Sequence, residues 1–171
     1  MAVDESAKGA RTYVPSGAGT SYWMMGGEQA TIKVSSGDTY GAYAVVELTI
    51  PPRIGPPPHI HHAMEETFYL LDGEIEFVAD GIATTATVGS LVRIPKGVLR
   101  GYSNVGAEPA RVLVFFLPGG FDGFLEETGL PVTDASPPPG EHPDVEKFVA
   151  TAAKYGCEIP LPTGRSGGHS L

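Results

Sequence analysis

His59-Ile60-His61, followed by Glu66 and Gly73, forms the pattern H-x-H-x4-E-x6-G among residues typical of β-strands. The side chains of a strand alternate between its two faces, so both histidines point to the same face. A carboxylate that follows a short bend can return to that face. Two imidazoles and one carboxylate bind first-row transition metals and leave coordination positions open. We therefore predict a metal site formed by His59, His61 and Glu66.

A second pattern, G-x5-P-x-G-x2-R-x3-N, covers residues 89–104. Together with the segments GPPPHIHH (55–62) and FYLLDG (68–73), it resembles the two motifs of the cupin superfamily, in particular those of small quercetin-dioxygenase-like cupins. Two positions depart from these motifs. Arg53 stands where the first motif begins with glycine, and Arg100 stands where the second has a histidine ligand. The resemblance implies an all-β fold, the cupin jelly-roll or double-stranded β-helix barrel.

Arg100 decides how much chemistry the sequence supports. A guanidinium stays protonated in proteins and cannot coordinate a metal ion. Three arrangements remain open. Arg100 can point away from a three-ligand metal site, bind an anionic substrate beside that site through a bidentate contact, or form an ion pair with Glu66 in a metal-free pocket. The second arrangement makes Arg100 a substrate-binding residue.

Short apolar runs separated by turn residues predict the strands of the barrel. They cover residues 21–25, 30–34, 40–50, 66–71, 74–77, 82–87, 91–94 and 110–117, with a hairpin turn at Asp80-Gly81. Closely spaced short strands indicate a jelly roll rather than a parallel sheet. We divide the chain into a flexible arm (1–18), the barrel core (19–118) and a C-terminal helical extension with a tail (119–171).

The C-terminal extension changes from strand patterns to helix patterns. Residues 121–127 predict a short helix, and Pro143 begins a second helix that has one apolar face and ends at Gly156. We expect the second helix to pack against the barrel or against a partner subunit. Related small cupins commonly pair through such peripheral elements, so the chain is predicted to form a homodimer.

Composition limits the possible partners and compartments. The 171 residues include 11 basic and 20 acidic side chains, a net charge of −9, without a basic cluster. This balance argues against binding of nucleic acid or of an anionic membrane. The single cysteine, Cys157, cannot form an internal disulfide, and we interpret it as a partly buried structural residue. No apolar signal segment opens the sequence, so the cytoplasm is the expected location.

Other residues are predicted to support the site or the core. We expect His62 beside the site or at the surface, His142 at the surface near a helix start, and His169 in the tail. Aromatic and sulfur-containing side chains can shape an apolar pocket, although barrel core is the better interpretation for most of them. They are Trp23, Met24, Met25, Phe68, Tyr69, Phe77, Phe115 and Phe116.

These features favour a metal-dependent cupin, a dioxygenase acting on an aromatic or polyphenolic small molecule, as the resemblance implies. The cofactor would be one divalent transition metal, Fe, Mn, Ni, Cu or Zn, because the ligand set suits them all. Glu66 would be a ligand or, alternatively, a catalytic base toward a phenolic hydroxyl. One alternative is a non-catalytic or metal-free cupin, in which Arg100 holds an anionic ligand or pairs with Glu66. Another is a metal-free isomerase of the sugar-modifying kind.

Overall fold

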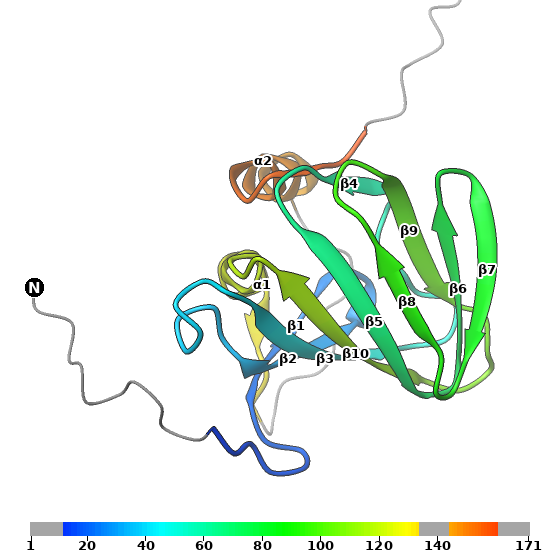
Figure 1. Ribbon diagram of the computed structural model, residues 1–171, viewed down its shortest axis with the longest axis horizontal. Coiled ribbons are helices and arrows are strands. Elements are labelled where there is room, and N and C mark those ends of the chain that lie inside the picture. The colour runs from blue at the N-terminus through cyan, green and yellow to red at the C-terminus, as the bar shows by residue number, and fades with distance from the viewer. Residues whose placement is uncertain (1–11, 134–143, 161–171) are drawn as a thin grey trace, which may run out of the picture.

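Two antiparallel sheets form the body of the molecule in the computed structural model, as Figure 1 shows. The structure describes residues 12–133 and 144–160. The seven-stranded sheet has the order β11-β1-β2-β3-β10-β5-β8, and the five-stranded sheet has the order β12-β4-β9-β6-β7. This arrangement confirms the predicted jelly-roll barrel.

The strand bounds follow the chain from one sheet to the other. The seven-stranded sheet contains β1 (Thr20–Trp23), β2 (Gln29–Val34), β3 (Ala44–Ile50), β5 (Glu65–Asp72), β8 (Leu91–Ile94), β10 (Ala110–Leu117) and β11 (Leu130–Pro131). The five-stranded sheet contains β4 (His59–His61), β6 (Glu74–Ala79), β7 (Ile82–Thr87), β9 (Leu99–Asn104) and β12 (Cys157–Glu158). A 3-10 helix covers Met25–Gly27, and two α-helices, α1 (Asp122–Thr128) and α2 (Val145–Lys154), follow the last long strand.

Two predicted strands are shorter than expected. The strand predicted over 21–25 ends at Trp23, because the chain then enters the 3-10 helix. The strand predicted over 40–50 begins only at Ala44, because Tyr40 and Gly41 have positive φ angles of 54° and 82°. Those angles belong to turns and do not occur in regular strands.

Three short strands were not predicted. They are β9, β11 and β12, of which β11 and β12 follow α1 and α2 in the sequence. Thus the C-terminal extension contributes one edge strand to each sheet. The predicted hairpin turn is confirmed, since Asp80 and Gly81 join β6 to β7 with φ angles of 51° and 78°.

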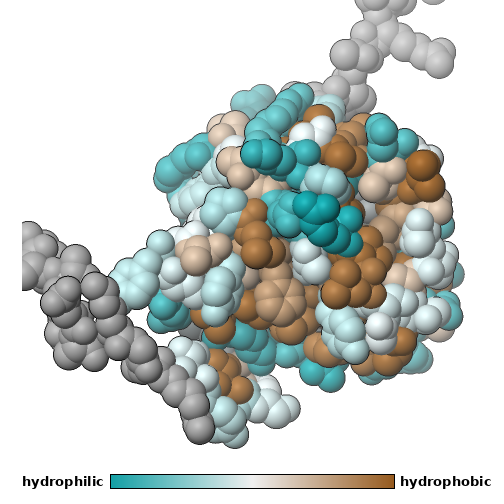
Figure 2. All heavy atoms as spheres, viewed as in Figure 1, coloured by the Kyte–Doolittle hydropathy of each residue, from teal (hydrophilic) through white to brown (hydrophobic). Residues whose placement is uncertain are grey.

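The core is formed by the inward-facing residues of both sheets. Each of these apolar side chains contributes on the order of 1.5–3 kcal/mol when it is fully buried. Among the most buried are Val46, Ile50, Phe68, Leu70, Ile75, Val112 and Val114. Figure 2 shows the outer surface, on which hydrophobic side chains lie among hydrophilic ones. Tyr69 and Leu91, which are paired across β5 and β8, are exposed hydrophobic side chains.

Helix α2 packs against the barrel, as predicted. Asp144 caps its first turn by accepting a hydrogen bond from the backbone N–H of Lys147, and Gly156 follows its end with a φ of 71°. The rings of Phe124 in α1 and Phe148 in α2 lie 5.2 Å apart, so the two helices contact each other beside β12. Residues 1–11 of the predicted arm, Pro143, His142 and His169 lie outside the described residues. Within the described ranges, no helix is long and apolar enough to cross a membrane.

Candidate functional site

Strand β4 carries both predicted histidine ligands. It is only three residues long and pairs with β9 on one side and β12 on the other. His59 and His61 are buried, with 7% and 0% of their surfaces exposed, whereas Ile60 between them is partly exposed. The predicted alternation is therefore confirmed, and it places both imidazoles inside the barrel.

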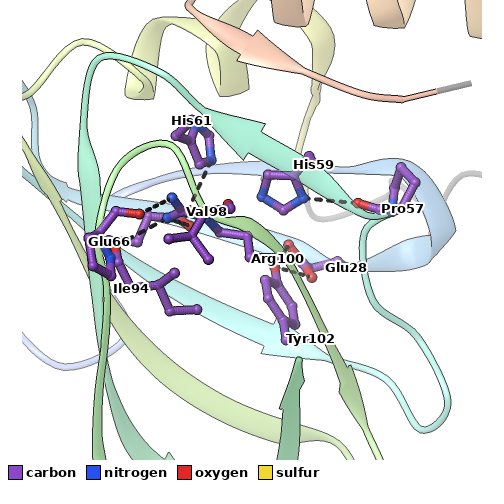
Figure 3. A network of polar contacts seen from close by, with 10 residues as sticks. Glu28, Pro57, His59, His61, Glu66, Ile94, Val98, Arg100 and Tyr102 are labelled. Carbon is purple, nitrogen blue, oxygen red and sulfur yellow. Dashed lines mark hydrogen bonds and ion pairs between the residues drawn. The ribbon is translucent and has the colours of Figure 1, made fainter. Parts of the chain in front are cut away.

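Glu66 approaches the histidines from β5 in the other sheet. Its side chain is buried, and its Oε1 lies 3.5 Å from Nε2 of His61. One ligand atom from each of His59, His61 and Glu66 can be chosen so that all lie within 4.8 Å of one another. Figure 3 shows the three side chains at close range. The structure thus brings together the three residues that the sequence predicted as one cluster.

The imidazoles have nitrogen atoms available for a ligand bond. Nδ1 of His59 donates a hydrogen bond to the Pro57 carbonyl oxygen at 2.9 Å, so Nε2 carries the lone pair of the neutral ring. Burial lowers the pKa of His59 and so favours that neutral form. Both ring nitrogens of His61 are buried and lack a hydrogen-bond partner among the described residues. A cation would supply the missing partner, so the cluster fits a divalent transition metal.

Arg100 lies behind Glu66 and is almost fully buried. Its Nη1 donates to Oε2 of Glu66 at 3.0 Å, while the other carboxylate oxygen, Oε1, faces His61. Backbone carbonyls accept its remaining hydrogen bonds: Ile94 at 3.3 Å, Pro95 at 2.6 Å and Val98 at 3.3 Å. The ion pair of the third predicted arrangement is therefore present, yet one oxygen of Glu66 remains directed toward the histidines.

Arg100 does not line the cavity that adjoins the cluster. An anionic substrate would have to replace one of its present partners to reach the guanidinium. The role of Arg100 in substrate binding stays a prediction, and its observed contact is with Glu66.

The environment keeps Glu66 ionised. Burial by itself raises the pKa of this carboxyl, but the His61 imidazole 3.5 Å away, with the charges of His59 and Arg100, lowers it to about 2. A carboxylate held in this form is ready to act as a ligand, because metals bind the ionised group. The same low pKa makes Glu66 a weak proton acceptor.

An apolar cavity of about 510 Å³ opens beside the cluster. His59, His61 and Glu66 form part of its wall, and both C-terminal helices form another part. The ring of Phe121, just before α1, contacts the His61 ring edge-on with 4.5 Å between centroids. Helix α2 contributes Phe148, among other residues. The C-terminal extension therefore shapes the site as well as covering the barrel.

Five of the eight predicted aromatic and sulfur-containing residues lie in the cavity wall or in the core, whereas Tyr69, against that expectation, is exposed at the surface. Met24, Met25 and Phe116 line the cavity. Phe68 and Phe77 belong to the buried core, where their rings lie 4.9 Å apart.

Two cavity residues were missed by the sequence analysis. Glu28, just before β2, is 8% exposed, and its carboxylate accepts hydrogen bonds from the Tyr102 hydroxyl at 3.1 and 3.0 Å. Burial raises the pKa of Glu28 to about 7, against the lowering effect of the Tyr102 hydrogen bond. Glu28 follows two glycines without a motif, and Tyr102 belongs to the unpredicted β9, so the sequence offered no spacing signal for this pair.

Two further residues lie where they were expected. His62 is at the surface, where its Nε2 is 2.8 Å from Oε2 of Glu158. Cys157 is buried opposite His61 in the β4–β12 pairing, and burial raises the pKa of its thiol to about 12. A thiol with that pKa is not a reactive nucleophile, in agreement with the predicted structural role.

We compared the sequence with models of protein families and with curated proteins. Residues 46–116 match the family model of the cupin domain, a stretch that holds all three cluster residues and Arg100. A search of curated proteins found no matching sequence.

Solved structures show the same fold at low sequence identity. KdgF from a Halomonas species is 16% identical, with a TM-score of 0.56 over 67% of this chain and 98% of that one. A predicted oxalate decarboxylase from Thermotoga maritima is 19% identical, with a TM-score of 0.58 over 62% and 98%. An RmlC-like cupin from Shewanella frigidimarina is 16% identical, with a TM-score of 0.57 over 67% and 96%. The domain match and these folds support the cupin superfamily.

Proposed function

We propose that this cupin-fold protein is a metal-dependent enzyme, a dioxygenase that acts on an aromatic or polyphenolic small molecule. One observation carries the proposal: the buried cluster of His59, His61 and Glu66 forms part of the wall of a largely apolar cavity. Enzyme sites commonly combine such a cavity with a few polar groups. The apolar lining suits an aromatic ligand, and the likeness of residues 55–62 and 68–73 to quercetin-dioxygenase-like cupins suggests the reaction class.

Each residue of the cluster would have a defined part in holding the ion. The Pro57 carbonyl fixes the His59 ring and leaves its Nε2 as the ligand atom. His61 would bind through one of its unpartnered nitrogens. Glu66 would bind through Oε1, while Arg100 holds Oε2 and fixes the plane of the carboxylate.

The ion would be one divalent transition metal, among Fe, Mn, Ni, Cu and Zn. When bound, it supplies Lewis acidity and, if redox-active, the electron transfer that dioxygen chemistry requires. The protein residues exclude water from the cavity and orient the substrate ring. A cavity of about 510 Å³ is within the range of small-molecule sites.

The ion pair between Arg100 and Glu66 favours a second candidate function. At 3.0 Å and with both side chains buried, this pair neutralises the charge of the carboxylate without a metal. A metal-free cupin that binds a small apolar molecule in the cavity is therefore the alternative. The two candidates differ in metal content and in turnover.

Metal analysis of neighbouring histidine variants tests the proposal. The protein purified without added metal should contain about one transition-metal ion per chain, and His61→Ala should lose it, because a ligand atom is removed. His62→Ala is the matched control and should keep the metal, because His62 is bound to Glu158 at the surface.

Oxygen consumption with a flavonol as probe should follow metal content across these proteins. Absence of metal from the parent protein would favour the binding-protein alternative. Equal loss in both variants would remove the His59–His61–Glu66 ligand set from consideration.

A further inference from the structure

We infer that Glu28 and Tyr102 form a second polar site in the cavity, at which Glu28 accepts the proton of a ligand hydroxyl group. The chemical class of that ligand, an aromatic compound with a phenolic hydroxyl, rests on the proposed function. The second polar site itself rests on the geometry of Glu28 and Tyr102, which come from the start of β2 and from β9.

The second polar site faces the same cavity as the metal-ligand cluster. Glu28 and Tyr102 line it together with His59, His61 and Glu66, while most of the remaining wall is apolar. Figure 3 shows Glu28 and Tyr102 next to each other below His59, with Glu66 apart from them at the left. A ligand in the cavity thus meets two separate polar regions with different chemistry.

Glu28 keeps unused capacity to accept hydrogen bonds. A carboxylate offers about four acceptor positions, and the side chain of Glu28 receives hydrogen bonds only from the Tyr102 hydroxyl among the described residues. No lysine, arginine or histidine of the described chain forms an ion pair with it. Glutamine or leucine could fill the same volume without a buried charge, so core packing alone gives no reason for a carboxylate here.

The surroundings suit proton exchange near neutral pH. Burial and the negative charge of Glu66 raise the pKa of Glu28 to about 7, while Tyr102 opposes this rise. The pKa of Glu66, in the same cavity, is lowered to about 2. Environments that separate two carboxyl groups in this way are typical of sites where one group exchanges protons and the other stays charged. Arg53 lines the cavity too, without an ion pair to Glu28.

The proposed step moves one proton. The ligand O–H bond breaks and its electron pair stays on the ligand oxygen, while a new O–H bond forms on the Glu28 carboxylate. The ligand becomes a phenolate, and the protonated Glu28 can return the proton to the product. Tyr102 positions the carboxylate through its hydroxyl and does not itself exchange the proton.

A fluorescent phenol tests proton acceptance at the second polar site in the absence of metal. Excited 2-naphthol is a strong acid, and it emits at longer wavelength once it has given its proton to a nearby acceptor. The full-length protein is treated with EDTA, mixed with 2-naphthol and titrated with pH. Naphtholate emission of the bound probe should rise about tenfold between about pH 6 and pH 8, as the ionised fraction of a group with a pKa of about 7 does.

Three variants test whether Glu28 is the proton acceptor that gives rise to the naphtholate emission. Glu28→Gln should lose this rise in naphtholate emission between about pH 6 and pH 8. Tyr102→Phe should keep it but move its midpoint to higher pH, because the Tyr102 hydrogen bond lowers the pKa of Glu28. Glu47→Gln, at a carboxylate on the outer face that is bound by Arg111, is the control and should behave like the parent. Binding of 2-methoxynaphthalene, which has no hydroxyl proton, checks that each variant keeps an intact cavity.

The inference is overturned if Glu28→Gln, with its cavity intact, keeps the parent's naphtholate emission. It is also overturned if the parent does not bind 2-naphthol, or if Tyr102→Phe leaves the midpoint in place. Because no metal is present in these measurements, their outcome is separate from that of the metal analysis described above.

Discussion

Replacing Glu28 by glutamine should stabilise the protein in alkaline solution and have little effect in acid. The reason is the burial of the carboxyl in the cavity wall, where only Tyr102 donates to it. In the folded protein the pKa of Glu28 is raised from 4.5 to about 7. The folded state therefore holds its proton over a pH range in which the unfolded chain has lost it.

This difference fixes the sign and the size of the effect. Stability falls with rising pH wherever the folded state binds more protons than the unfolded state, here between about pH 4.5 and pH 7. Each pKa unit corresponds to about 1.36 kcal/mol, so the full interval corresponds to about 3 kcal/mol. Glutamine cannot ionise and escapes this loss. The variant should gain up to about 3 kcal/mol over the parent by about pH 8, and close to nothing near pH 4.

Guanidinium unfolding of parent and variant at a series of pH values measures the difference directly. Glu47→Gln provides a control of opposite sign. Burial raises the pKa of Glu47, but hydrogen bonds and charge from Arg111 and Lys33 outweigh it and lower the pKa. Glu47 therefore stabilises the fold above its unfolded pKa, and Glu47→Gln should lose stability in neutral solution and recover it relative to the parent in acid.

A constant difference between Glu28→Gln and the parent at all pH values would refute the reasoning. So would a variant that is less stable than the parent at about pH 8, since that result would mean that the ionised carboxylate is favourably paired in the folded state.

Three further predictions concern the ion pair, the motif glycine and the assembly. Arg100→Met should lower the free energy of unfolding in guanidinium by about 3–5 kcal/mol, because buried Glu66 loses its cationic partner. Arg93→Met, at a surface ion pair, should lower it by less than about 1 kcal/mol. Equal losses in the two variants would contradict this prediction. Gly73→Ala should lower the melting temperature more than Gly81→Ala: both have positive φ, but only at Gly73 would the new Cβ meet another strand, at 2.8 Å. Light scattering should give a homodimer, and a mass near 17.9 kDa would contradict it.

The sequence predicted the regular part of the barrel because its strands obey simple patterns. Strands β7, β8 and β10 have the bounds that were predicted from their turn residues and apolar runs. The His59–His61–Glu66 cluster was also predictable, since strand alternation alone places the two histidines on one face. These features depend on local spacing, which a sequence displays directly.

Strand β9 was missed for a physical reason that concerns the site. Two of its inward positions are occupied by polar residues, Arg100 and Asn104, so the apolar alternation that identifies a half-buried strand is absent. Their burial is stabilised by hydrogen-bond partners outside β9. Asn104 donates to the Ile50 and Glu108 carbonyls, and Arg100 binds Glu66 from another sheet. Functional and polar sites often break the local rules that reveal the rest of a fold.

The metal-ligand cluster and the Glu28–Tyr102 pair influence each other electrostatically across the cavity. Arg100 and Glu66 form a neutral pair, and burial favours neutral His59, so these residues offset little of the charge of a bound divalent cation. An added cation would favour the ionised form of any carboxyl that faces the same cavity, which lowers the pKa of Glu28. Loss of the proton from Glu28 and binding of the cation therefore assist each other. The loaded cavity would favour an anion over a neutral ligand, and a phenol whose proton has passed to Glu28 supplies that anion without requiring one from solution.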